Sequence, residues 1–230
     1  MKRLSAVAVA LLIGVSSVSA SWDYFPVIEQ GSAEAKLSYD GELGLKIRYG
    51  LIDNLELFAA SGAANCAEYA LGARYQIVPD MLSAFVDLGI PYTSGGDWGL
   101  TPGIQFSTNF TETISLGVGA QIPLHLNHPD AGDNGDDGLS VDLAAGLELD
   151  IALSEQVLFW VGVDFTYDRL TQENREDLEI KSALAPAIGF TFSKDNLAVG
   201  TSLGIKLDAV NDKLEESIGL IGGVDFSIKF

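Results

Sequence analysis

The C-terminal fourteen residues, Ser217–Phe230, carry the most restrictive pattern in the chain. Counted back from the end, every second side chain is bulky and apolar except Gly222: Phe230, Ile228, Phe226, Val224, Leu220 and Ile218. The side chains between them are small or polar except Ile221: Lys229, Ser227, Asp225, Gly223, Gly219 and Ser217. Successive side chains of a strand point to opposite faces. The second face, made of glycine, serine and single charged residues, suits the crowded interior of a narrow barrel. We therefore predict that the apolar face points outward.

The same alternation recurs along the whole chain from Glu34 onward, between turn-rich breaks. It predicts twelve strands, at about 34–39, 42–49, 55–59, 69–75, 82–90, 98–106, 114–124, 139–151, 157–167, 180–192, 197–207 and 218–230. Short and long breaks alternate. The short ones are Leu51–Asn54, Val78–Met81, Asn109–Thr113, Leu153–Gln156 and Ser193–Asn196, and the longer, more acidic ones include Thr93–Asp97, His125–Gly138, Asp168–Asp177 and Val210–Glu216.

Short turns on one side and long loops on the other are typical of transmembrane barrels with an even number of strands. The predicted fold is therefore all-β: a single transmembrane antiparallel up-and-down β-barrel of about twelve strands. A soluble β-sandwich shares the alternation and is the alternative.

The N-terminus indicates export. Lys2 and Arg3 precede the apolar run Ala6–Val15, and Val18-Ser19-Ala20 has the small-x-small pattern of a cleavage site. We predict a signal peptide at 1–20 and a barrel at 21–230, in the outer membrane of a Gram-negative cell. The apolar run is too short for a spanning helix, and an exported chain without such a helix either stays soluble or closes a barrel.

The net charge and the cysteine count exclude two other classes of protein. A formal charge of −19 argues against nucleic acid as a partner, which requires a basic surface. The single cysteine, Cys66, rules out an intrachain disulfide framework.

Residues Tyr49–Leu57 read Tyr-Gly-Leu-Ile-Asp-Asn-Leu-Glu-Leu. This stretch resembles a hairpin of the phenol-degradation meta-pathway outer-membrane family, and the terminal Phe230 resembles the end of outer-membrane barrels in general. The resemblance implies a barrel for the passage of small, often hydrophobic compounds, without a catalytic residue. Expected partners are outer-membrane lipid, a small-molecule solute and the barrel assembly machinery, which would meet the C-terminal strand that Phe230 closes.

Strand parity predicts which charged residues line the lumen. The bases crowd one wall and the acids mostly the other; the predicted lining residues are Lys46, Arg48, Arg74, Asp87, Asp142, Glu148, Asp150, Asp164 and Asp225. Either the two walls face each other across water, or they pair and plug the barrel. Trp160, also inward, is either a constriction or part of such a plug.

Twelve strands lie between the filled eight-stranded and the open sixteen-stranded barrels, so size alone does not decide whether the lumen is open. Because small inward residues such as Gly117, Gly119 and Gly146 leave room, we favour a passive channel with a narrow, acidic, cation-tolerant lumen. The alternative function is a non-conducting structural or adhesive barrel that displays acidic loops.

Two chemical hypotheses are weaker. A lipid-facing hydrolase would depend on His125 and His128, which we interpret as loop residues because no serine motif accompanies them. An external calcium site at Asp130, Asp133, Asp136 and Asp137 has the oxygen donors that calcium prefers but misses the usual spacing. No other cofactor is expected.

Overall fold

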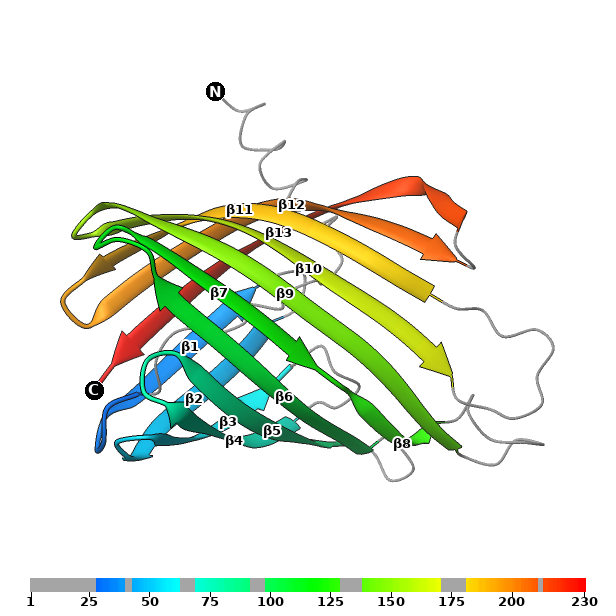
Figure 1. Ribbon diagram of the computed structural model, residues 1–230, viewed down its shortest axis with the longest axis horizontal. Helices are drawn as coiled ribbons and strands as arrows, with labels where there is room; N and C mark the ends of the chain where they lie inside the picture. Colours follow the sequence, from blue (N-terminus) through cyan, green and yellow to red (C-terminus); the bar gives the residue numbers. More distant parts are fainter. Residues whose placement is uncertain are drawn as a thin grey trace.

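The computed structural model describes residues 28–39, 43–62, 69–91, 98–128, 138–170, 181–210 and 213–230. Within these ranges every regular element is a strand. The thirteen strands are β1 (Ala33–Tyr39), β2 (Leu43–Ile52), β3 (Leu55–Ser61), β4 (Tyr69–Val78), β5 (Leu82–Ile90), β6 (Trp98–Asn109), β7 (Ile114–Gln121), β8 (Leu124–His128), β9 (Gly138–Ser154), β10 (Val157–Leu170), β11 (Lys181–Lys194), β12 (Leu197–Val210) and β13 (Lys213–Lys229). They form one antiparallel sheet rolled into a tilted cylinder (Figure 1).

Strands β7 and β8 are two halves of one strand position in the wall. Both pair with β6 on one side and with β9 on the other. The ladder breaks at Ile122–Pro123 because proline has no N–H to donate. Ile122 N instead donates to Pro102 O at 3.0 Å, and Pro123 O accepts from Asp142 N at 2.9 Å. The barrel therefore has twelve strand positions, as predicted, with the seventh interrupted.

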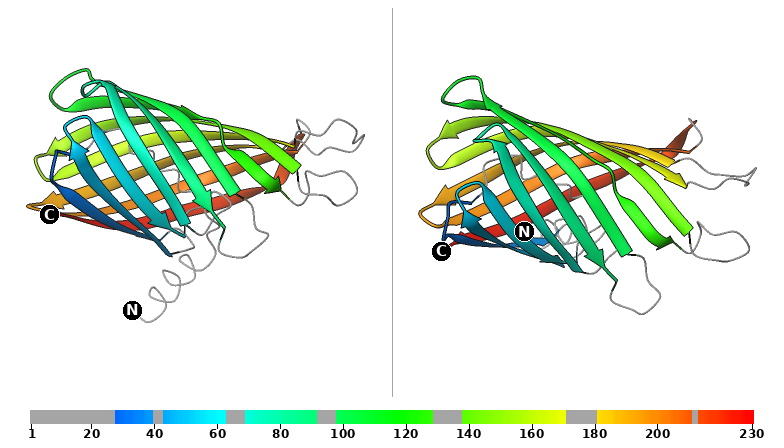
Figure 2. Two further views of the ribbon diagram at one scale, coloured as in Figure 1. Left: turned by 90° about the horizontal axis from the view of Figure 1, so that it is seen from below. Right: turned by 60° about the horizontal axis from the view of Figure 1, so that its bottom comes forward.

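The cylinder is closed by its first and last strands. β1 pairs with β13 from Glu34 opposite Lys229 to Tyr39 opposite Val224. The seam ends in two backbone hydrogen bonds, from Phe230 N to Ala33 O at 2.8 Å and from Ala33 N to Phe230 O at 3.2 Å. The predicted closure at Phe230 is confirmed, and Figure 2 shows β1 beside β13 from two further directions.

All five short turns lie at one end of the barrel, together with the C-terminus (Figure 1). By the rule of the class this is the periplasmic end. Two of these turns hold an aspartate in the left-handed region, Asp80 with φ 59° and Asp195 with φ 52°, a conformation that aspartate tolerates better than most residues.

Several predicted breaks extend too far into the neighbouring strands; the predicted loop Asp168–Asp177, for example, overlaps β10, which reaches Leu170. The predicted loop Val210–Glu216 is wrong in extent, because β13 already begins at Lys213, paired with Val210. Likewise His125 belongs to β8 and not to the loop after it, because strand pairing with β6 and β9 resumes beyond Pro123.

The wall is uneven in height. Strands β1 to β5 have 7 to 10 residues each, whereas β9 to β13 have 14 to 17. Because all are tied to short turns at the periplasmic end, the surplus length of β9 to β13 lies at the opposite end.

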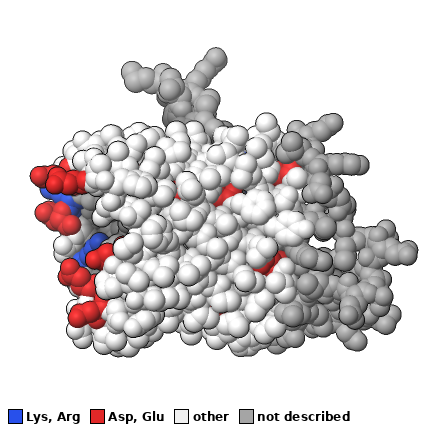
Figure 3. Space-filling model, viewed as in Figure 1, with Lys and Arg blue, Asp and Glu red and all other residues white. Residues whose placement is uncertain are grey.

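The burial pattern is that of a barrel with its apolar side outward. Large apolar side chains are exposed along the outer face; Leu43 is 65% exposed and Leu203 54%. Among the described residues the only buried apolar ones are Ala185 and Ile221, whereas twelve buried residues are polar or charged. In the side view of Figure 3, Lys and Arg appear only at the short-turn end. The sandwich alternative is wrong, because the apolar rows do not pack against each other.

Across the described residues, no helix has the length and the apolarity needed to cross a membrane. The predicted signal peptide lies outside the described residues and stays a prediction, as does any role for Cys66.

We expect Leu203→Arg to lower the free energy of unfolding in lipid vesicles by about 2–4 kcal/mol, because it places a charge against the bilayer core. Ser202→Arg is the matched control: Ser202 points inward between Gly189 and Gly223 of the adjacent strands. Denaturant titration of the refolded barrel measures both. Equal effects of the two substitutions would contradict an outer face in contact with lipid.

Candidate functional site in the barrel lumen

Four charged residues on the inner face of β1 to β4 form a compact ionic group, which we call the Glu56 cluster: Glu34, Arg48, Glu56 and Arg74. Arg48 holds the fully buried Glu56 by two hydrogen bonds, from Nε to Oε1 at 2.8 Å and from an Nη to Oε2 at 2.7 Å. Glu34 lies 3.5 Å from Arg48, and Arg74 lies 3.7 Å from Glu56. Because two arginines and two glutamates meet, the cluster is neutral overall.

The segment before β1 turns into the lumen and is fixed on this cluster. Ile28 N donates to Glu56 Oε2 at 3.2 Å. Gly31 N donates to Gly50 O at 2.8 Å, and Gly50 N donates to Ser32 O at 3.0 Å. A Cβ at Gly50 would collide with the carbonyl oxygens of Ile28 and Glu29, so glycine permits this close approach. The sequence does not predict this contact, because Gly50 is recognisable there only as part of a hairpin motif.

In the described strands, three aromatic side chains point inward, and each lies over a glycine that faces it on the next strand. Phe58 faces Gly72, Phe85 faces Gly103, and Trp160 faces Gly189 in the strand register. A Cβ built on any of these glycines would collide with the ring. The rings therefore lie against the wall, and Lys46 Nζ sits 4.9 Å from the centre of the Phe58 ring. The indole of Trp160 covers the wall at Gly189, and its role as a constriction stays a prediction.

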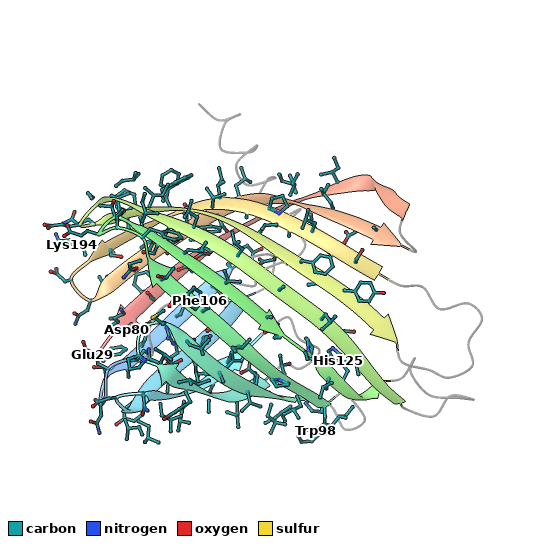
Figure 4. All side chains as sticks on the ribbon, viewed as in Figure 1. Glu29, Asp80, Trp98, Phe106, His125 and Lys194 are labelled. Carbon is teal, nitrogen blue, oxygen red and sulfur yellow. The ribbon has the colours of Figure 1, made fainter. Side chains whose placement is uncertain are left out.

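The acids gather mainly on β9 and β10. Asp142, Glu148 and Asp150 on β9 and Asp164 on β10 alternate with outward residues such as Leu143, Leu147 and Phe165, which are exposed. Asp142 Oδ2 lies 2.8 Å from His125 Nε2. The prediction that His125 is a loop residue is wrong. His125 lies on β8, is 5% exposed and faces the lumen. Figure 4 shows it between the strands, away from the short turns.

All nine predicted lining residues lie on the inward face. The bases of β1 to β4 are paired locally, as in the Glu56 cluster and in Lys36, which lies 3.8 Å from Asp225. Both predicted arrangements of the two walls, facing each other across water or pairing as a plug, stay predictions. Asp87 on β5 is close enough to Lys46 and Arg74 to interact with their charges. The acids of β9 and β10 lie apart from the Glu56 cluster in the strand order.

The two sides of the lumen differ in access to water. On β2 to β6 the inward polar side chains are mostly buried, among them Arg48, Glu56, Arg74, Gln76, Ser83, Thr101, Gln105 and Ser107. On the other side several charged groups are partly exposed. The side chains of Asp142, Lys206 and Asp225 are 17%, 31% and 33% exposed. Water therefore reaches the inner wall mainly along β9 to β13.

Among the described residues, no group of three or more His, Cys, Asp or Glu side chains is placed to hold a metal ion. The predicted calcium ligands Asp130, Asp133, Asp136 and Asp137 lie outside the described residues, as does the side chain of His128.

Comparison with known proteins identifies the fold. No protein-family model matches the chain, and no curated protein matches it. Among solved structures, the chain is similar to the COG4313 outer membrane channel from Pseudomonas putida F1, with a TM-score of 0.67 and 15% identity over 93% of this chain and 100% of that one. It is also similar to the NanC porin, with a TM-score of 0.58 and 9% identity over 86% and 100%.

A third similar structure is the KdgM porin in complex with disordered oligogalacturonate, with a TM-score of 0.51 and 10% identity over 86% and 99% of the two chains. At these identities the likeness establishes the fold, that of an outer-membrane β-barrel, which confirms the predicted class.

Glu56→Gln should destabilise the barrel by about 3–5 kcal/mol, because two buried arginines lose their shared carboxylate. Asp225→Asn is the control, and its effect should be about 0–1 kcal/mol, since that ion pair is longer and partly exposed. Denaturant unfolding of the reconstituted barrel compares the two. Similar small losses for both variants would mean that the Glu56 cluster does not hold the wall together.

Gly103→Ala should cost about 1–3 kcal/mol, because the new methyl group must displace the Phe85 ring. In a Phe85→Ala background the same change should cost little, which gives a coupling energy of about 0.5–3 kcal/mol in a double-mutant cycle. Gly219→Ala serves as the control, because its Cβ would meet Lys206 at ordinary contact distances of 3.5 and 3.7 Å. Additive effects of Gly103→Ala and Phe85→Ala would contradict the packing of ring on glycine.

Proposed function

We propose that this protein is a passive outer-membrane channel that conducts small hydrophilic solutes with a preference for cations. The observation that carries the proposal is the partly exposed acidic strip on β9, β10 and β13, formed by Asp142, Glu148, Asp164 and Asp225 on the lumen side of a closed barrel. A carboxylate-lined path in a low-dielectric wall attracts cations and repels anions.

The Glu56 cluster, which lies on β1 to β4 on the other side of the lumen, supports the same proposal. Its positive charges are compensated within the wall, so they contribute little field in the lumen. The acids of β9 and β10 then dominate the potential that a solute meets. The inward rings also lie against the wall, which leaves more of the cross-section free.

The second candidate is a non-conducting barrel that displays acidic loops, and conductance distinguishes it from a channel. A lipid-facing hydrolase gains no support, since His125 points into the lumen and is hydrogen-bonded to Asp142. We assign no catalytic residue. Recognition of β13 by the barrel assembly machinery belongs to the proposal, since this strand closes the sheet onto β1.

The test is single-channel recording in planar bilayers under a salt gradient. The wild-type protein should conduct, with a reversal potential of the sign expected for cation preference. The double variant Asp142→Asn/Asp164→Asn should shift the reversal potential towards zero, whereas Glu112→Gln, in an exposed turn, should leave it unchanged. Folded, inserted protein without conductance, or a reversal potential that the double variant does not move, would overturn the proposal.

A further inference from the structure

Two carboxyl groups on β9 are in direct contact within the barrel wall. Glu148 and Asp150 are two residues apart on the inward face, and their side chains are hydrogen-bonded to each other. Asp150 is 3% exposed, and its Oδ1 has no hydrogen-bond partner in the described structure. A buried carboxylate oxygen without a partner is costly and calls for an explanation such as an unobserved ion.

The residues that face Glu148 have no side chain of their own. Glu148 faces a glycine on each neighbouring strand, Gly117 on β7 and Gly162 on β10. On the β10 side the position is bordered by the indole of Trp160, which a Cβ on Gly162 would meet at 3.6 Å. Asp150 faces Ser115 on β7 and Trp160 on β10. Since Asp150 is hydrogen-bonded to Glu148, its carboxyl group is directed towards this glycine-flanked position.

The atoms available for coordination determine which kind of ion can bind here. Two carboxyl groups can share a hydrogen bond only when a proton lies between them, and a cation in that place would satisfy both groups and the orphaned oxygen. The available protein donors are oxygens: two carboxylates and, from the facing strand, a serine hydroxyl. Hard divalent cations prefer such donors and complete their coordination with water.

We propose that Glu148 and Asp150 form a binding site for one hard divalent cation, Ca²⁺ being the representative, on the inner wall of β9. The site is distinct from the acidic segment 130–137. It does not depend on conduction, because an ion held there would also bind to a barrel that passes no solute.

The test measures binding directly on the full-length, detergent-refolded barrel. Calorimetric titration with CaCl₂ should show one ion per chain. Glu148→Gln and Asp150→Asn each keep the side-chain shape and should weaken the affinity by about tenfold or more. Asp208→Asn is the matched control and should leave the affinity unchanged, because the carboxylate of Asp208 on β12 is already paired with Lys206 at 2.9 Å.

A spectroscopic readout locates the ion. Terbium replaces calcium at oxygen sites and luminesces when a nearby indole transfers energy to it. Trp160 is the cross-strand neighbour of Asp150, whereas Trp98 lies at the opposite end of the barrel (Figure 4). Excitation of tryptophan should therefore produce terbium emission that Trp160→Phe abolishes, while calorimetry on that variant still detects binding.

Three results would overturn the proposal. One is the absence of calcium binding to folded wild-type protein. Another is binding that survives both Glu148→Gln and Asp150→Asn, particularly if it is lost in Asp133→Asn/Asp136→Asn, which would assign the ion to the segment 130–137. The last is terbium emission that Trp160→Phe leaves intact. None of these results bears on the conductance experiment, so the two proposals fail independently.

Discussion

The structure depends on the need to pair every backbone N–H and C=O group that faces lipid. Hydrocarbon offers no water to replace a missing partner, so an open sheet edge is not tolerated there. This chain meets the requirement at the seam between β1 and β13, where Ala33 and Phe230 exchange two hydrogen bonds. The interruption at Ile122–Pro123 is repaired by two hydrogen bonds, in which Ile122 N donates to Pro102 O of β6 and Asp142 N of β9 donates to Pro123 O. Once the sheet is closed, the alternation of side chains decides what faces lipid and what faces the lumen.

Inside the barrel, the size and charge of an inward side chain are matched by the residues that face it on the neighbouring strands. Large inward rings lie over glycines, and Gly200 accommodates the carboxylate of Asp225 in the same way. Arginines on β2 and β4 share a glutamate on β3. The result is one wall of buried, mutually satisfied polar groups and another wall that water reaches. That asymmetry, and not the net charge of the chain, makes the acids of β9 and β10 relevant to a solute.

Much of this fold could be predicted, because the alternation is local: the outward row Leu139 to Ile151 and its inward partners follow from parity alone. Turn length predicted the polarity of the barrel for the same reason. Interactions that do not follow from the alternation of side chains could not be predicted from the sequence. The pairing of Trp160 with Gly189 depends on the register between strands, the contact of Ile28 with Glu56 on a chain reversal, and the place of His125 on pairing that resumes after a proline. Contacts between residues far apart in sequence leave no local periodic signal.

The unequal strand lengths have a consequence for the outside of the cell. At roughly 3.3 Å per residue, strands of 14 to 17 residues exceed the span of a bilayer core, whereas strands of 7 to 10 do not. The far ends of the long strands include two acidic and two basic residues, Asp168, Arg169, Lys213 and Glu215. The outer rim of the barrel is therefore slanted, and it is higher on the side of β9 to β13. A molecule that approaches from the medium therefore meets the raised strand ends before it meets the opening.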